Sequence, residues 1–200
     1  RREIRVFLDI ELEADVAFVV DNFLECYHCP VAHKDFCTLV EMDTYEVVTD
    51  GIWSRQYAEA GKTANSAYDV EDASVTMQTV WWLWPNTCLL RFPGRPNFMV
   101  LQILPDGPGR TLETIDFYLE KPEPSPAEVE AIRYIDDVLQ VEDIAIVESI
   151  QRGMASPAFE AGRIVVERGP GGEENPSGRS EHAVHHFHGL LLDAYRQALE

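Results

Sequence analysis

Positive charge is scarce in this sequence. Its 200 residues include 16 Lys and Arg against 35 Asp and Glu, which gives a formal net charge of −19. This balance repels phosphate backbones and anionic lipid surfaces, so we expect neither nucleic acid nor a membrane as a partner. The sequence also lacks a secretory signal and any apolar run of about 18 residues, the length of a transmembrane helix. We therefore expect a cytoplasmic protein.

Cysteines are also few. Cys26, Cys29, Cys37 and Cys88 are too few and too closely spaced for a disulfide framework in a chain of this size, so reduced thiols are expected. The apolar content of 46% is sufficient for the core of one domain over residues 1–200. Because the chain begins with Arg1 and opens directly on a strand-like stretch, we expect a piece of a longer protein.

The periodicity of apolar residues predicts an α+β fold. An amphipathic helix is expected over residues 14–27, followed by about six or seven short antiparallel strands between residues 44 and 119. Ser125-Pro126-Ala127-Glu128 is typical of a helix start, and Gly153 is a plausible end for that helix. A last helix is expected from about Glu181 to Leu199. This order of elements favours helices packed against an antiparallel sheet.

Two histidines near the first helix suggest a metal site. His28 and His33 are five residues apart, so an unbroken helix would separate their directions by roughly 140°. Pro30 lies between them and interrupts a regular helix, which allows the two imidazoles to converge. Two imidazoles with a carboxylate and open positions are typical of iron(II) oxygenases, although imidazoles also suit zinc, copper and nickel.

Asp143 is the best-motivated carboxylate for a third ligand. It lies in the middle of an apolar helical stripe, where an unpaired carboxylate costs several kcal/mol unless a partner or a metal compensates it. The stripe consists of Val129, Ile132, Ile135, Leu139, Asp143, Ile146, Val147 and Ile150. Asp136 is a competitor near its polar edge, whereas Glu142 and Glu148 lie off the stripe. A buried aspartate can also be a hydrogen-bonded structural residue.

These residues carry a family resemblance. Asn22-Phe-Leu-Glu-Cys-Tyr-His28-Cys-Pro-Val-Ala-His33, together with Glu142-Asp143 and Glu148-Ser-Ile-Gln-Arg-Gly153, resembles the catalytic domain of Rieske non-haem iron oxygenase α-subunits. The branch that oxidises quaternary amines is the most similar, and it includes glycine betaine and carnitine monooxygenases and proline betaine demethylases. The resemblance covers nearly the whole chain, including the strand at Trp81–Pro85 and the last helix.

The resemblance implies specific roles for these residues. His28, His33 and Asp143 match the ligands of a mononuclear Fe(II), and Glu25 matches the acid that passes electrons from the Rieske [2Fe–2S] cluster of a neighbouring subunit. Glu25 precedes His28 by one helical turn, so its carboxylate can also orient that imidazole. Asn22 can be a site residue or a structural polar residue. No substrate-binding residue can be assigned.

The resemblance also implies a fold and a reaction. The expected fold is a helix-grip (START-like) arrangement, in which a curved antiparallel sheet encloses the helix that carries Asp143. The expected reaction uses O₂ to hydroxylate a small substrate, and an N-methyl group hydroxylated in this way would leave as formaldehyde. A homotrimer, a reductase or ferredoxin, and NAD(P)H as the indirect electron source are also implied.

One departure concerns the cluster. A Rieske centre takes two cysteines and two histidines as ligands. The family supplies them from a Cys-x-His and a Cys-x-x-His pair, but this sequence contains only Cys26-Tyr-His28. We therefore expect the amino-terminal Rieske domain to be absent from these residues, so that the chain alone cannot accept the electrons for turnover. Either that domain lies outside this sequence, which the start at Arg1 favours, or the chain is a degenerate relative.

Several alternatives remain open at this stage. Cys26, His28, Cys29 and His33 form an alternative zinc site, although structural zinc ligands usually come from two separated pairs. The last helix carries His182, His185, His186 and His188, which we expect to be solvated or capping. We predict that Trp81, Trp82 and Trp84 pack in the core. The alternative is that their rings surround a trimethylammonium group through cation–π attraction. As rivals in function, we keep a zinc-dependent hydrolase and a metal-free helix-grip ligand-binding module.

Overall fold

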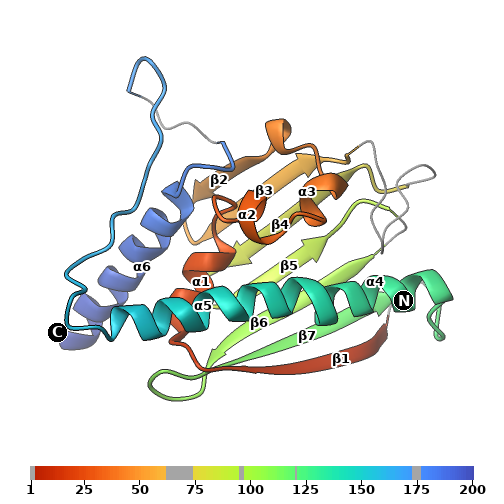
Figure 1. The fold of residues 1–200 in the computed structure, drawn as a ribbon, viewed down its shortest axis with the longest axis horizontal. Coiled ribbons are helices and arrows are strands. Elements are labelled where there is room, and N and C mark those ends of the chain that lie inside the picture. The colour runs from red at the N-terminus through yellow and green to blue at the C-terminus, as the bar shows by residue number, and fades with distance from the viewer. Residues whose placement is uncertain (1–2, 62–73, 95–96, 120, 173–176) are drawn as a thin grey trace.

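A seven-stranded antiparallel sheet forms the base of the structure (Figure 1). The computed structural model describes residues 3–61, 74–94, 97–119, 121–172 and 177–200. The strands are β1 (Glu3–Leu12), β2 (Glu46–Asp50), β3 (Trp53–Glu59), β4 (Met77–Leu83), β5 (Thr87–Arg91), β6 (Phe98–Pro105) and β7 (Thr111–Leu119). Their order is β1-β7-β6-β5-β4-β3-β2, so a meander runs from β2 to β7 and β1 closes the far edge. The predicted α+β class and the strand number are confirmed.

The alternation of side chains along β7 decides what faces the helices. Every second residue from Thr111 to Leu119 is buried, because successive side chains of a strand point to opposite faces. Glu113 and Ile115 lie on the buried face, whereas Asp116 lies on the other face. One buried carboxylate therefore lies on the same sheet face as the apolar core.

A long helical segment crosses this face of the sheet (Figure 1). It consists of α4 (Pro126–Tyr134), a π-helical turn labelled η2 (Ile135–Leu139) and α5 (Gln140–Met154). The Ser125 side chain accepts a hydrogen bond from the backbone of Glu128, whose own carboxylate accepts one from Ser125, so the predicted start of the helix is confirmed. The π turn was not predicted. Leu139 and Asp143 are four residues apart, which places them on one face of the helical segment, and both line the cavity described below.

The remaining helices lie on the same side of the sheet, and α6 lies beside β2 (Figure 1). They are α1 (Val16–Phe23), α2 (Cys29–Ala32), α3 (Phe36–Leu39), the 3₁₀ turn η1 (Met42–Thr44) and α6 (His182–Leu199). Within the described ranges, every helix is too short or too polar to span a bilayer.

The first helix is shorter than predicted. It ends at Phe23, not at Tyr27. In a continuing helix the Phe23 carbonyl would accept from the Tyr27 backbone, but it accepts instead from the Gln56 side chain at 2.5 Å. The Tyr27 N–H donates to the Glu25 carboxylate. A contact from strand β3 therefore ends the helix, which a helical pattern alone does not predict.

The predicted stripe on the long helix is only partly correct. Val147 is 1% exposed and Ile135 is 5% exposed, as expected for core residues. Ile150 was also predicted on the buried stripe, but it is 42% exposed, near the end of α5 that extends past the strand ends (Figure 1).

The tryptophans serve packing, as predicted. Trp82 is 1% exposed, and its ring lies 5.4 Å from that of Phe187 on α6. Trp81 points to the opposite face of the sheet, where its ring lies 4.9 Å from that of Trp53. Among the described residues that line the main cavity, none is Trp81, Trp82 or Trp84.

Candidate metal centre

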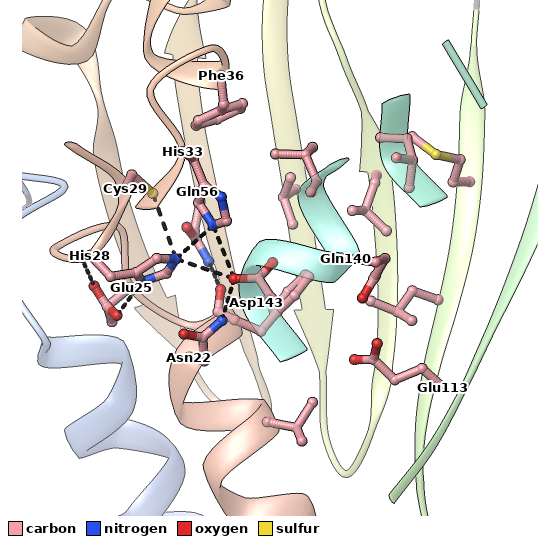
Figure 2. A pocket seen from close by; sticks show the side chains of 18 of the residues that line it. Asn22, Glu25, His28, Cys29, His33, Phe36, Gln56, Glu113, Gln140 and Asp143 are labelled. Atoms are coloured by element: carbon pink, nitrogen blue, oxygen red, sulfur yellow. Dashed lines mark hydrogen bonds and ion pairs between the residues drawn. The ribbon is translucent and has the colours of Figure 1, made fainter. Parts of the chain in front are cut away.

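Three side chains from two distant segments converge at one point (Figure 2). The Nε2 atoms of His28 and His33 are 3.1 Å apart. Asp143 Oδ1 lies 2.9 Å from His33 Nε2 and 3.5 Å from His28 Nε2. Among the described residues, this is the one cluster of His, Cys, Asp and Glu with metal-binding spacing. The structure thus brings together the three residues predicted as ligands, although the role itself stays a prediction.

The backbone around His28 differs from the predicted geometry. His28 is the residue before α2, and Pro30 lies in the first turn of this short helix, not at a break between two helical halves. The chain has already left α1 at Phe23. His33 follows the end of α2 with a non-helical backbone conformation, and its N–H donates to Cys29 O at 2.8 Å. The imidazoles converge because a separate short helix connects them.

The far nitrogen of each imidazole meets a carboxylate. His28 Nδ1 lies 2.5 Å from Glu25 Oε1, which agrees with the predicted orienting role of Glu25. His33 Nδ1 lies 2.8 Å from Glu142 Oε2. Such contacts fix which ring nitrogen is free for a metal and make that nitrogen a better ligand. Sequence reasoning missed Glu142 because it lies off the apolar stripe. The available signal was its position, because Glu142 directly precedes the predicted ligand Asp143.

Two further predictions concern the aspartates and Asn22. Asn22 Nδ2 donates to Asp143 Oδ1 at 2.7 Å, so its amide contacts the triad directly and helps to orient the carboxylate. Asp136, the competitor of Asp143, is not a member of the cluster.

The electrostatics of the triad favour bound positive charge. Burial alone would lower the pKa of His28, but the carboxylates of Asp143 and Glu25 outweigh this effect and raise it to about 9. Burial likewise opposes protonation of His33, yet Asp143 and Glu142 raise its pKa. Burial would raise the pKa of Asp143, but the two histidines hold it well below its usual range. The site is therefore a carboxylate-rich centre that stabilises a cation.

The three ligand atoms fit a first-row metal ion. Metal–nitrogen and metal–oxygen bonds of about 2.1 Å place adjacent ligand atoms about 3.0 Å apart at right angles. The observed separations of 2.9, 3.1 and 3.5 Å are close to that value. Two imidazoles and one carboxylate on one side of an ion correspond to the ligand set of non-haem iron(II) oxygenases.

The cysteines correct one expectation and remove an alternative. Cys26 and Cys29 form a disulfide, with Cα atoms 5.0 Å apart, so the expectation that all thiols are reduced is wrong for this pair. The turn after α1 brings the two side chains within disulfide reach. Cys37 and Cys88 are free. Because a disulfide sulfur cannot be a thiolate ligand, the zinc site of two cysteines and two histidines is not formed.

The histidines of α6 have other partners. His182 was expected to be solvated or capping, but it is 5% exposed. Its Nδ1 lies 3.1 Å from Ser180 Oγ, and its Nε2 lies 2.7 Å from the Val47 carbonyl oxygen. His188 lies 2.8 Å from Asp21, and His186 contacts the Gly51 carbonyl at 3.0 Å. These contacts attach α6 to α1 and β2, so they are structural.

A cavity opens beside the triad (Figure 2). Its volume is about 140 Å³, comparable to the roughly 150 Å³ cavity that admits a benzene-sized molecule. Most of its wall is apolar, and the described side chains that form it include Val19, Leu90, Phe92, Met99, Leu101, Ile115, Ile135 and Leu139. The polar groups are the triad with Glu25 and Asn22 at one side, and a few residues elsewhere, Glu113 among them.

Comparison with known proteins identifies the family. Residues 18–197 match the family model described as the catalytic domain of the ring hydroxylating alpha subunit. The chain belongs to this family. It is 34% identical over 179 residues to the carnitine monooxygenase oxygenase subunit of Escherichia coli K12, covering 89% of this chain and 46% of that protein. It is 28% identical to the chloroplastic choline monooxygenase of Spinacia oleracea, covering 90% of this chain and 38% of that protein.

A solved structure supports the same family assignment. A quaternary ammonium Rieske monooxygenase superposes with a TM-score of 0.85 at 29% identity, over 95% of this chain and 50% of that chain. The domain therefore spans half or less of the length of these relatives. The predicted resemblance and the helix-grip type of fold are confirmed.

Proposed function

We propose that this domain is the catalytic part of an oxygenase that uses O₂ to hydroxylate or N-demethylate a small quaternary amine. His28, His33 and Asp143 would hold a mononuclear Fe(II), which supplies the activation of O₂. The single observation that carries the proposal is the convergence of these three ligand atoms beside a cavity, in a chain of this family.

Each polar residue of the site has a task in this proposal. Glu25 and Glu142 hold Nδ1 of His28 and His33, so that each Nε2 atom faces the shared centre. Asn22 fixes the Asp143 carboxylate through its amide. The apolar wall keeps bulk water from the reacting C–H bond and positions it.

Glu25 also provides an exit from the site toward the protein surface. Tyr27, whose backbone N–H donates to the Glu25 carboxylate, is 62% exposed, and Val31 on α2 is 80% exposed. The Glu25 carboxylate, in contact with His28, thus lies close to accessible surface. We propose that electrons from a Rieske [2Fe–2S] cluster pass through this contact, with a reductase or ferredoxin and NAD(P)H as the more distant donors.

The overall reaction balances with these partners. One O₂, two electrons and two protons convert an N-methyl group to N-hydroxymethyl and one water, and a hydroxymethyl group on a quaternary nitrogen then leaves as formaldehyde and a proton. A homotrimer in the cytoplasm, with the cluster of one subunit beside the Glu25 of the next, remains part of the prediction. The relatives reported above are monooxygenases, so neither a zinc hydrolase nor a metal-free binding module is supported.

Metal analysis tests the proposal. We expect about one iron per chain after anaerobic Fe(II) reconstitution of the wild type, and a sharp loss of iron in Asp143→Ala. Asp136→Ala is the matched control, since it removes an aspartate from the same helical segment but not from the cluster. Full iron in Asp143→Ala would refute the triad. Preferential binding of zinc over iron, with no O₂ consumption by the complete electron-transfer system, would refute the oxygenase.

A further inference from the structure

Glu113 is a buried carboxylate that the proposed metal centre does not use. It lies on the inner face of β7, is 4% exposed, and lines the cavity. Figure 2 shows it on the opposite side of the cavity from His28 and His33. Its Oε2 atom has no hydrogen-bond partner among the described residues. A buried carboxylate oxygen without a donor is costly, which suggests that a ligand group compensates it.

The surroundings of Glu113 define the kind of group that fits. Leu12 on β1, Leu101 on β6 and Ile115 on β7 line the cavity beside it. A quaternary ammonium group has no N–H to donate, but its positive charge can offset the negative charge of the Glu113 carboxylate directly. It needs apolar contacts and an anion within reach, and this end of the cavity offers both.

We propose that Glu113 is the residue that recognises the positive charge of the substrate, and that it places the ammonium group so that its methyl groups face the triad. This inference rests on the proposed function, because it names the residue that selects the amine. It assigns Glu113 a positioning role in the cavity and no role in binding the metal.

The protonation behaviour of Glu113 agrees with this role. Burial, and secondarily the negative charge of Asp143, raise its pKa to about 8. The negative form is thus disfavoured in a cavity without a cation, and a bound cation would stabilise it. The carboxylate can therefore exist in the core as a neutral acid and become an anion when the substrate arrives.

The test compares two molecules of nearly the same shape. Choline and 3,3-dimethylbutan-1-ol differ in having N⁺ or carbon at the branched centre. We expect the Fe(II)-loaded protein under anaerobic conditions to bind choline at least about tenfold more tightly by calorimetry. Glu113→Gln should lose about tenfold or more in choline affinity, as expected when one partner of a buried charge pair is removed. Its affinity for the alcohol should not change.

Two variants serve as controls. Asp116→Asn removes the same charge from the same strand but on the outer face, so it should keep the preference for choline. Glu113→Asp keeps the charge on a shorter side chain and should retain part of the preference. Thermal unfolding of each variant separates a binding defect from a folding defect.

The outcomes distinguish this inference from the proposed function. If Glu113→Gln keeps the preference, or if the wild type binds choline no better than the alcohol or not at all, Glu113 does not recognise charge. If the preference depends on Glu113 but the complete electron-transfer system releases no formaldehyde and hydroxylates no quaternary amine, the inference stands and the proposed reaction is wrong.

Discussion

His33 is held between two consecutive residues of α5: its Nδ1 lies 2.8 Å from Glu142 Oε2, and its Nε2 lies 2.9 Å from Asp143 Oδ1. Neighbouring helical residues point about 100° apart, so the imidazole inserts between two diverging carboxylates. One of them is a proposed metal ligand, and the other orients the ring. This contact connects the segment after α1 to the long helix.

Replacing Glu142 should weaken metal binding without abolishing it. Glu142→Gln keeps a hydrogen-bonding oxygen but loses the negative charge that makes the His33 imidazole a stronger ligand. We expect Fe(II) affinity to fall about 10- to 100-fold, the usual effect of losing such a partner. Competition with a chromogenic chelator under anaerobic conditions measures it. Asp136→Asn on the same helical segment should show wild-type affinity, and an unchanged affinity in Glu142→Gln would contradict the role assigned here.

Glu25→Gln should separate iron binding from electron delivery. The glutamine oxygen can still accept from the Tyr27 and His28 backbone N–H groups, as the carboxylate does. The contact of Glu25 Oε1 with His28 Nδ1 loses its charge, so we expect iron affinity to fall about 10- to 100-fold, and the measurement uses iron-saturated protein. Electron transfer from the cluster to the iron in the complete enzyme, followed by stopped-flow spectroscopy, should slow by a much larger factor. Glu148→Gln on α5 is the control, and an undiminished rate in Glu25→Gln would exclude this route.

The stability of the protein should depend on Glu113 in a defined pH range. Its pKa is raised from 4.5 to about 8 in the folded state, so the folded chain retains this proton to higher pH than the unfolded chain. The free energy of unfolding must then decrease as the pH rises from about 4.5 to 8. Glu113→Gln cannot ionise and should escape this loss.

We expect the wild type and Glu113→Gln to have equal free energies of unfolding near pH 4. Near pH 9 the variant should be more stable by a few kcal/mol, since one pKa unit corresponds to about 1.4 kcal/mol. Urea unfolding at several pH values measures the difference. A difference that does not change with pH would show that Glu113 titrates normally.

The capping box at the start of α4 should contribute measurably to stability. Ser125 accepts from the Glu128 backbone and its own N–H donates to the Glu128 carboxylate at 2.7 Å. Ser125→Ala removes the first bond and should cost about 1 kcal/mol in urea unfolding. Ser149 is exposed in the middle of α5, so Ser149→Ala should be neutral or slightly stabilising. Equal effects of the two changes would argue against the cap.

Much of the fold could be predicted from the sequence because its signals are local. The β-rich runs between residues 44 and 119 predict the strands β2 to β7, and the Ser125-Pro126 motif predicts the start of α4. The three proposed ligands could be predicted because their residue types and spacing carry the chemistry.

The remaining features depend on contacts between distant segments. Gln56 ends α1 from strand β3, and Glu142 meets His33 only after the long helix crosses the sheet. The Cys26–Cys29 disulfide likewise follows from a turn that begins four residues early. None of these has a periodic signature in the sequence.

The separation of the ligands along the chain has a consequence for folding. His33 and Asp143 are 110 residues apart, so an ion bound by both closes a loop that includes most of the sheet. A covalent cross-link closing a loop of about 100 residues is worth roughly 4–5 kcal/mol in chain entropy, and a tightly bound ion acts as a reversible counterpart. Chelation would open that loop, so the cell's supply of metal would set how long this domain survives proteolysis.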